Sequence, residues 1–143
     1  MEDSDFPAVL DMERRSYSHP WTESTFQSCL LPNYRLWLLL DGDALAGYAV
    51  VCYQVDEAHL LNICIAPNQR RRGAGRWLLR HIAACAAHDG MAMVLLEVRV
   101  SNLNAIGLYA SEGFQEIGER PGYYPAVQGR ENAKVMKLTL AAS

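Results

Sequence analysis

The sequence LNICIAPNQRRRGAG, residues 61–75, contains the signals that decide the fold. It begins as an apolar, β-rich run, passes through Pro67 and three consecutive arginines, and ends in two glycines that open a helix with one apolar face. Gly73 and Gly75 leave space where backbone N–H groups and the positive end of the helix dipole converge. The stretch therefore predicts a phosphate-binding loop, and an ordinary solvated loop is the alternative.

Several other function classes are disfavoured by the sequence. The loop lacks the Lys-Ser/Thr pair of a nucleotide P-loop, which argues against nucleoside-triphosphate hydrolysis. Across 143 residues, 13 Lys and Arg against 16 Asp and Glu give a net charge of −3, which argues against direct nucleic-acid binding. The longest apolar run, residues 44–53, is far shorter than the ~20 residues of a membrane-spanning helix. Scattered cysteines and histidines indicate free thiols in a reducing cytoplasm and no metal site.

Outward from the loop, hydrophobic periodicity and turn signals predict further helices and strands. The predicted helices are Phe6–Ser16, Thr22 to near Leu30, Gly75–His88 and Asn104–Glu112. The predicted strands are Tyr34–Leu40, Ala44–Gln54, Glu57–Ile65, Met93–Val100, Phe114–Arg120 and Ala133–Leu140. Hairpin-linked strands come first and strand–helix–strand crossovers follow. This order predicts a single α+β domain over residues 1–143, with a mixed, largely antiparallel sheet and helices on both faces.

The loop and the segments after it resemble the GNAT N-acetyltransferases. The pattern R-x-x-G-x-G, here RRRGAG at residues 70–75, follows a predicted strand as in the pyrophosphate loop of that family. LEVRVSN at residues 96–102 follows at the corresponding distance, with Tyr109 and Phe114 behind it. HPWTESTF at residues 19–26, with YYP and GRE near the end, is similar to the bacterial RimI-type ribosomal-protein alanine N-acetyltransferases. The resemblance extends over residues 5–140.

This resemblance implies the GNAT acyl-CoA N-acyltransferase fold, with acetyl-CoA as cosubstrate and no metal. Main-chain amides of the loop would hold the pyrophosphate, and the preceding strand would pair with the pantetheine arm and supply an oxyanion donor. The implied cofactor-binding residues are Ile63, Cys64, Ile65, Arg71, Arg72, Gly73, Ala74, Gly75, Arg76 and Asn102. For Asn102, a helix-capping role is an alternative that is compatible with cofactor binding.

Glu97 is the predicted proton acceptor. Acetyl transfer needs a neutral amine, and an α-amino group with a pKa of ~7.7–8.0 requires only a mild base near pH 7. Glu97 interrupts a strand beside Leu95 and Leu96, where a carboxylate is unusual. The resemblance assigns it the base role, acting through a water. The alternative is a carboxylate that faces solvent or pairs with Arg99 on its own sheet face.

Tyr109 is the predicted proton donor. A phenol with a pKa near 10 can protonate a departing thiolate, and the resemblance places this tyrosine as the general acid. Its alternative is an aromatic side chain that fills the core on one face of a short helix.

Four residues are candidate walls of the peptide entrance: Pro20, Trp21, Tyr123 and Tyr124. An N-terminal peptide is extended, so flat aromatic surfaces suit it. Trp21 has a second interpretation as one half of a hydrophobic staple with Phe26. The tyrosine pair follows Pro121-Gly122, where the family usually has a basic residue and an asparagine, and this departure bears on the geometry of the substrate loop.

The resemblance implies an enzyme that acetylates the N-terminal alanine of the eighteenth small-subunit ribosomal protein in the cytoplasm. Its partner would be that ribosomal peptide, with no nucleic acid and no membrane. Two alternatives remain from the sequence: an acetyltransferase for small amines or for protein N-termini and lysines more broadly, and a non-catalytic acyl-CoA-binding partner of translation proteins.

Overall fold

A computed structural model describes residues 3–67, 73–126 and 129–140. Its helices are a 3-10 turn η1 (Asp3–Asp5), α1 (Phe6–Ser16), α2 (Glu23–Gln27), α3 (Ala74–His88) and α4 (Leu103–Ser111). Its strands are β1 (Tyr34–Asp41), β2 (Ala44–Gln54), β3 (Glu57–Ile65), β4 (Met93–Arg99), β5 (Gln115–Pro125) and β6 (Arg130–Thr139). None of the described helices has the length and apolar character required to span a lipid bilayer.

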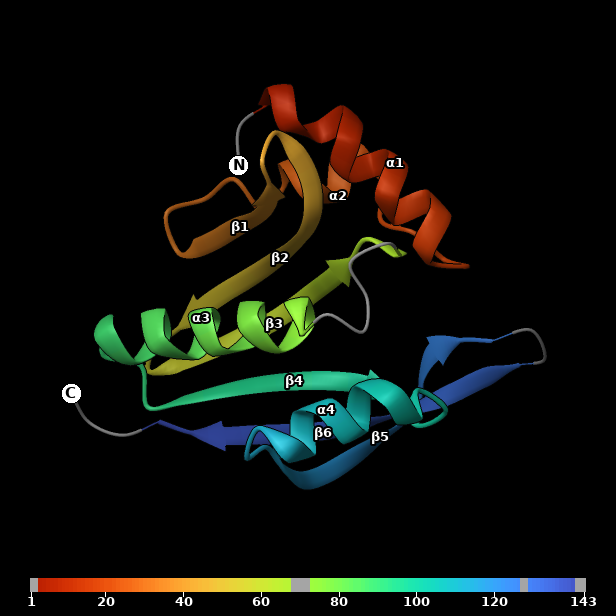
Figure 1. Ribbon diagram of the computed structural model, residues 1–143. Helices are drawn as coiled ribbons and strands as arrows, with labels where there is room; N and C mark the ends of the chain where they lie inside the picture. The colour runs from red at the N-terminus through yellow and green to blue at the C-terminus, as the bar shows by residue number, and fades with distance from the viewer. Residues whose placement is uncertain (1–2, 68–72, 127–128, 141–143) are drawn as a thin grey trace.

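The strands form one six-stranded sheet in the order β1-β2-β3-β4-β6-β5 (Figure 1). Every neighbouring pair is antiparallel except β3 and β4, which are parallel. The mixed, largely antiparallel sheet expected from the sequence is therefore confirmed.

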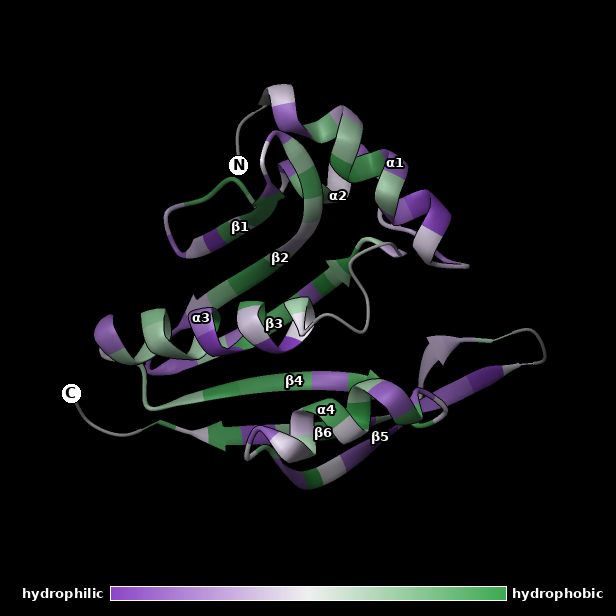
Figure 2. Ribbon diagram, in the orientation of Figure 1, coloured by the Kyte–Doolittle hydropathy of each residue, from purple (hydrophilic) through white to green (hydrophobic). Residues whose placement is uncertain are grey.

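Helices cover both faces of this sheet, as predicted. Strand β2 shows why, because its side chains alternate between the two faces. Tyr48 and Val50 are buried against α1 and α2, whereas Ala49 and Val51 are buried against α3 and α4. Figure 2 shows β2 and β4 as mostly apolar and β5, at the sheet edge, as largely hydrophilic. The protein thus has two apolar cores, one on each face.

The parallel pair β3–β4 is short, and this feature positions the site. The two strands pair only from Glu57 opposite Met93 to Leu60 opposite Leu96. Beyond that point they diverge (Figure 1), and we call Leu61–Ile65 of β3 and residues 97–99 of β4 the fork. The Ala66 amide donates to the Ala46 carbonyl of β2. Because backbone groups alternate in direction along a strand, those of Ile63 therefore face into the fork.

Most predicted boundaries lie within a few residues of the observed ones, and two require correction. Helix α2 ends at Gln27 rather than near Leu30, because Cys29 and Leu30 donate to carbonyls three residues earlier and form turns. Strand β5 continues past Arg120 to Pro125. A bulge at Gly122, which has φ of 60°, lets pairing resume at Tyr124 opposite Glu131. The tyrosine pair therefore lies on a strand and not in a loop.

Candidate active site

The start of α3, which follows the predicted phosphate loop in the sequence, provides backbone donors. Gly73 is the N-cap residue with a left-handed backbone, φ 77° and ψ 9°, which favours glycine. The first helical bond runs from the Trp77 amide to the Gly73 carbonyl, so helix geometry leaves the amides of Ala74, Gly75 and Arg76 for an external acceptor. Arg71 and Arg72 lie outside the described residues. The described part of the loop has the donors that a pyrophosphate requires.

The Arg76 side chain is engaged elsewhere. It donates to Glu112 at 2.8 Å, and Arg80 contacts the same carboxylate, so two residues of α3 are tied to the end of α4. Hydrogen bonding to Arg80, assisted by Arg76, lowers the pKa of Glu112. The Arg76 guanidinium therefore holds the two helices together, and the predicted contact with a phosphate is left to the backbone amide.

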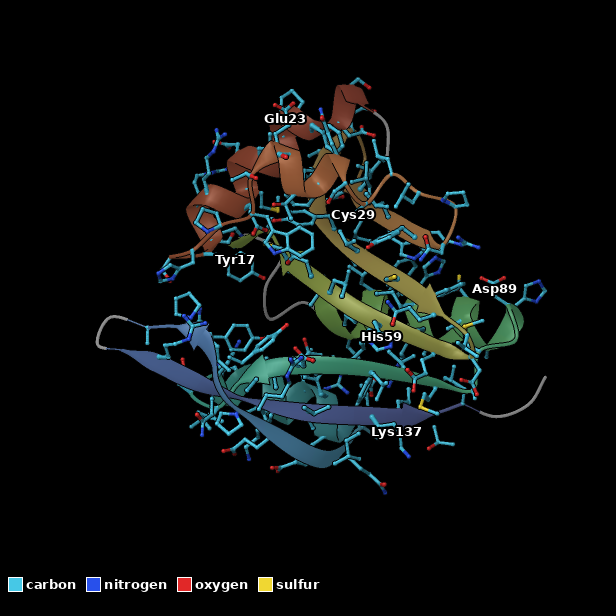
Figure 3. All side chains as sticks on the ribbon, turned by 180° about the vertical axis from the view of Figure 1, so that it is seen from behind. Tyr17, Glu23, Cys29, His59, Asp89 and Lys137 are labelled. Carbon is cyan, nitrogen blue, oxygen red and sulfur yellow. The ribbon has the colours of Figure 1, made fainter. Side chains whose placement is uncertain are left out.

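The β3 arm of the fork is contacted by Tyr17, a residue that the sequence did not indicate. The Tyr17 hydroxyl donates to the Ile63 carbonyl at 2.5 Å. Tyr17 follows α1 directly, and Figure 3 shows it beside the end of β3. The Ile63 and Ile65 side chains pack against the core below α3 and α4, and Cys64 is buried in the core below α1. The three predicted cofactor-binding residues of β3 thus have their side chains in the cores, and Ile63 presents its backbone groups to the fork.

The β4 arm carries Glu97, which pairs with Arg120 of β5. Arg120 donates to Glu97 Oε1 at 2.8 Å, and the Glu97 side chain is 28% exposed. Arg99 instead contacts Glu131 and the Pro125 carbonyl. Of the alternatives weighed from the sequence, pairing with Arg99 is therefore wrong. Glu97 does form an ion pair, but with a residue from the far strand of the sheet.

Both tyrosines of the predicted pair lie beside Glu97. The Tyr124 hydroxyl donates to the Glu97 carbonyl at 2.9 Å, and the Arg120 guanidinium lies over the Tyr123 ring at 4.3 Å. The two rings meet edge to face at 4.9 Å. Hydrogen bonding with the Glu97 carboxylate, together with burial, raises the pKa of Tyr123. The structure thus brings Glu97, Tyr123 and Tyr124 together, with Arg120 as an additional member of the cluster.

Tyr109 lies on α4 with its ring in the core. It is 7% exposed and packs against Phe114 with ring centroids 5.6 Å apart. Burial raises the pKa of Tyr109 to about 12, so the phenol stays protonated at neutral pH. Burial also raises the pKa values of Tyr17 and Tyr124, and electrostatic interaction with Tyr109 adds to both shifts. Tyr109 is therefore a core aromatic that is also close to the tyrosines on both sides of the fork.

The remaining predicted residues have clear structural positions. Asn102 caps α4, where its side chain accepts from the Ala105 amide at 3.3 Å. Trp21 packs on Phe26 with ring centroids 5.1 Å apart, which confirms the hydrophobic staple. Pro20 is exposed. No hydrogen bond, ion pair or ring contact within the described residues joins Trp21 to Glu97 or Tyr109, so Trp21 is not brought into the Glu97 cluster.

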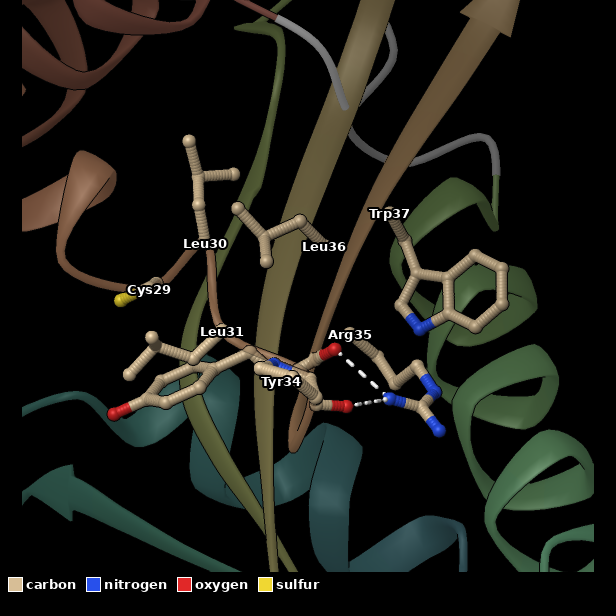
Figure 4. Close-up of a pocket in the computed structure, with 8 residues that line it drawn as sticks. Cys29, Leu30, Leu31, Tyr34, Arg35, Leu36 and Trp37 are labelled. Atoms are coloured by element: carbon tan, nitrogen blue, oxygen red, sulfur yellow. Dashed lines mark hydrogen bonds between the residues drawn. The ribbon is translucent and has the colours of Figure 1, made fainter.

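A surface hollow of about 490 Å³ lies elsewhere, at the edge of the sheet (Figure 4). Within it, the Arg35 guanidinium donates to the carbonyls of Pro32 and Tyr34. None of the predicted site residues lines this hollow. Its lining consists of Cys29, Leu30, Leu31, Pro32, Tyr34, Arg35, Leu36 and Trp37.

Known proteins that are similar to this chain include acetyltransferases. The Acetyltransferase (GNAT) family model matches residues 6–114. The [ribosomal protein bS18]-alanine N-acetyltransferase of Escherichia coli strain K12 is 40% identical, over 99% of this chain and 95% of the relative. The protein of the same name from Haemophilus influenzae is 34% identical, over 98% and 96%.

Solved structures agree with the fold. The ribosomal-protein-S18-alanine N-acetyltransferase from Escherichia coli superposes with a TM-score of 0.94 at 39% identity, covering 100% of this chain and 92% of the other. Arabidopsis thaliana NAA60, in complex with a bisubstrate analogue, superposes with a TM-score of 0.87 at 16% identity, covering 100% and 97%, and shows the fold alone. The chain therefore belongs to the GNAT family of acetyltransferases and is an acetyl-CoA-dependent N-acetyltransferase.

Proposed function

We propose that this enzyme acetylates the α-amino group of an N-terminal alanine on a ribosomal protein, the eighteenth protein of the small subunit. The observation that carries the proposal is the similarity, over nearly the whole chain, to relatives named for that reaction. The cluster of Glu97, Tyr123 and Tyr124 at the fork supports it, because it offers a carboxylate beside flat aromatic surfaces that suit an extended peptide. The reaction would take place in the cytoplasm, without nucleic acid or membrane.

In this proposal the cosubstrate binds across the fork. The amides of Ala74, Gly75 and Arg76, with the loop residues before them, would hold its pyrophosphate at the positive end of α3. The backbone of Ile63 to Ile65 would pair with its pantetheine arm. The Ile63 carbonyl already accepts from Tyr17, but a carbonyl oxygen has two lone pairs and can take a second donor. Asn102 would hydrogen-bond the arm from its position at the start of α4.

Glu97 is assigned as the proton acceptor, acting through a water. Arg120 contacts Oε1, and the carboxylate keeps further lone pairs that can accept the proton that the amine loses. The attacking nitrogen then forms a bond to the acetyl carbonyl carbon, and the carbon–sulfur bond breaks as the thiolate leaves.

Tyr109 is assigned as the proton donor to that thiolate. Its raised pKa of about 12 keeps the hydroxyl protonated until the thiolate forms. Its place in the core fixes the ring, and in this proposal the hydroxyl reaches the thiolate at the fork. Tyr123 and Tyr124 would form the wall along which the peptide lies, with Pro20 and Trp21 on the opposite side.

The test uses acetyl-CoA with a short peptide that begins with alanine. We expect the enzyme to acetylate this peptide and to lose that activity when the N-terminus of the peptide is blocked. We also expect no acetylation of an N-blocked peptide that contains lysine. If the enzyme acetylated a polyamine or an amino-sugar in preference to the peptide, its substrate would be a small amine and the proposal would be wrong. Mass spectrometry of ribosomal proteins from cells that lack this chain then identifies the natural substrate, which should lose one acetyl group from its N-terminal alanine.

A further inference from the structure

Glu13, in the last turn of α1, is the one buried charged side chain among the described residues, at 2% exposed. Its carboxylate accepts from the Tyr48 hydroxyl at 2.5 Å and from Asn62 Nδ2 at 3.0 Å, both on Oε1. Oε2 accepts from the Trp21 amide at 2.9 Å. A buried carboxylate is costly unless donors satisfy it, and here three neutral donors do so. The donors come from β2, from β3 and from the connection between α1 and α2.

The connection from Tyr17 to Trp21 is fixed to β3 at both of its ends. At one end the Tyr17 hydroxyl contacts Ile63, and at the other the Trp21 amide reaches Asn62 through Glu13. The Glu13 carbonyl also accepts from the Tyr17 amide at 3.1 Å. Residues 18–20 between these ends are exposed and make no backbone hydrogen bond to the rest of the described chain. The position of this connection therefore depends on its two ends.

We propose that Glu13 is a positioning residue for the peptide substrate. It holds the connection of residues 17–21 at the β3 arm of the fork, so that the exposed residues of the connection meet the acceptor peptide beyond its first residue. The inference rests on the proposed function in one respect, namely that the acceptor is a peptide that extends out of the fork. Glu13 touches neither the amine nor the cosubstrate and acts through the Trp21 amide.

A pair of variants separates this role from simple core stability. Glu13→Met combined with Tyr48→Phe removes the carboxylate and the hydroxyl that would otherwise be buried without a partner. Tyr48→Phe alone is the matched control, because it removes one donor but keeps the contact between Glu13 and Trp21. Each variant is assayed with two acceptors, a hexapeptide beginning with alanine and alanine amide, which is too short to reach the connection.

In the double variant, kcat/KM for the hexapeptide is expected to fall about tenfold relative to kcat/KM for alanine amide, mainly through a higher KM. The KM for acetyl-CoA should change less than about twofold, and Tyr48→Phe should keep the wild-type ratio of the two acceptors. Equal losses for both acceptors, or the same loss in the control, would overturn the proposal.

Hydrogen exchange provides a readout that does not depend on turnover. The Trp21 amide should exchange faster in the double variant than in Tyr48→Phe, with α3 unchanged in both. Unchanged exchange at Trp21 would overturn the positioning role even if neither acceptor were a substrate. If the wild-type enzyme acetylated neither acceptor while the Trp21 amide did lose protection, the proposed function would fail and the role of Glu13 in holding the connection would stand.

Discussion

One glutamate lies at each arm of the fork, and the two glutamates differ in what surrounds them. Glu13, behind the β3 arm, is 2% exposed and has neutral donors on both carboxylate oxygens. Glu97, on the β4 arm, is 28% exposed and has one cation, Arg120, on one oxygen. A carboxylate that accepts from three neutral donors on three different segments is suited to holding those segments together. A partly exposed carboxylate beside the fork can be reached by a substrate, which is what the proposed role of Glu97 requires.

Replacing Glu97 by Gln should give the largest effect. The substitution keeps the side-chain volume and removes the proton acceptor, so turnover at pH 7 should fall by about 10²–10⁴-fold with near-normal acetyl-CoA binding. Activity should partly recover at higher pH, where more of the amine is already neutral. Glu116→Gln on β5, which breaks only an exposed pair with Lys134, is the matched control and should keep full activity. Undiminished turnover at neutral pH would make Glu97 a structural residue like Glu13.

Tyr109→Phe tests the hydroxyl that is assigned as the proton donor. If it protonates the thiolate, turnover should fall by about 10²-fold, and a cosubstrate with a more acidic thiol should reduce the defect. With the pKa of Tyr109 raised to about 12, wild-type turnover should show no loss from this group up to about pH 10.

Tyr53→Phe is the control for Tyr109→Phe, since it removes a hydroxyl that contacts Asp89 outside the site. It should leave kcat unchanged. A defect in Tyr109→Phe that is the same for all leaving groups would instead indicate misplaced cosubstrate.

Gly73→Val should weaken the binding of acetyl-CoA without affecting the groups that transfer protons. Gly73 has φ 77°, which a β-branched residue resists, so the start of α3 would move and acetyl-CoA affinity should fall by about tenfold or more. Gly75→Val should also weaken binding, although a Cβ there meets Leu108 and Ile65 only at 3.5 and 3.6 Å. Gly107→Ala in α4, where a Cβ meets no atom within 4 Å, is the control and should bind normally. Calorimetry with normal affinity for Gly73→Val would contradict the backbone site.

Arg120→Met should have the smallest effect of the four. Arg120 is 54% exposed, and solvent-exposed pairs contribute little to stability, so the melting temperature should change little. Turnover should fall only a few-fold, because Glu97 keeps its position on β4 but loses the cation that orients it. Lys134→Met, which breaks the pair with Glu116, is the control for loss of a surface cation. A loss as large as that of Glu97→Gln would make Arg120 part of the chemistry.

Much of this fold was predictable because its signals are local. The bounds of α1, β2 and β3 coincide with those expected from apolar periodicity and from the turns between them. The contacts of Glu13 were not predictable, since its side-chain partners lie 8, 35 and 49 residues away in the sequence. An acidic residue beside the apolar positions of α1 was the only available signal.

The candidate site also has parts that the sequence could predict and parts that it could not. Glu97 could be identified because it interrupts an apolar strand, and the loop before α3 because glycines and arginines are adjacent there. The ion pair between Glu97 and Arg120 could not be predicted, because β6 lies between β4 and β5 in the sheet. The position of Tyr123 and Tyr124 depends on the bulge at Gly122, which sequence patterns suggested only as a loop.

The short β3–β4 pairing also has a mechanical consequence. It is a seam between two three-stranded antiparallel halves of the sheet, β1-β2-β3 and β4-β6-β5, each made from a continuous part of the chain. Only the segment containing α3 crosses the seam covalently. A cosubstrate that contacts Ile63 on one side and Asn102 on the other would join the two halves, so its binding free energy would stabilise the sheet against separation of the halves. Saturation with acetyl-CoA would then make the two halves of the sheet unfold as one unit.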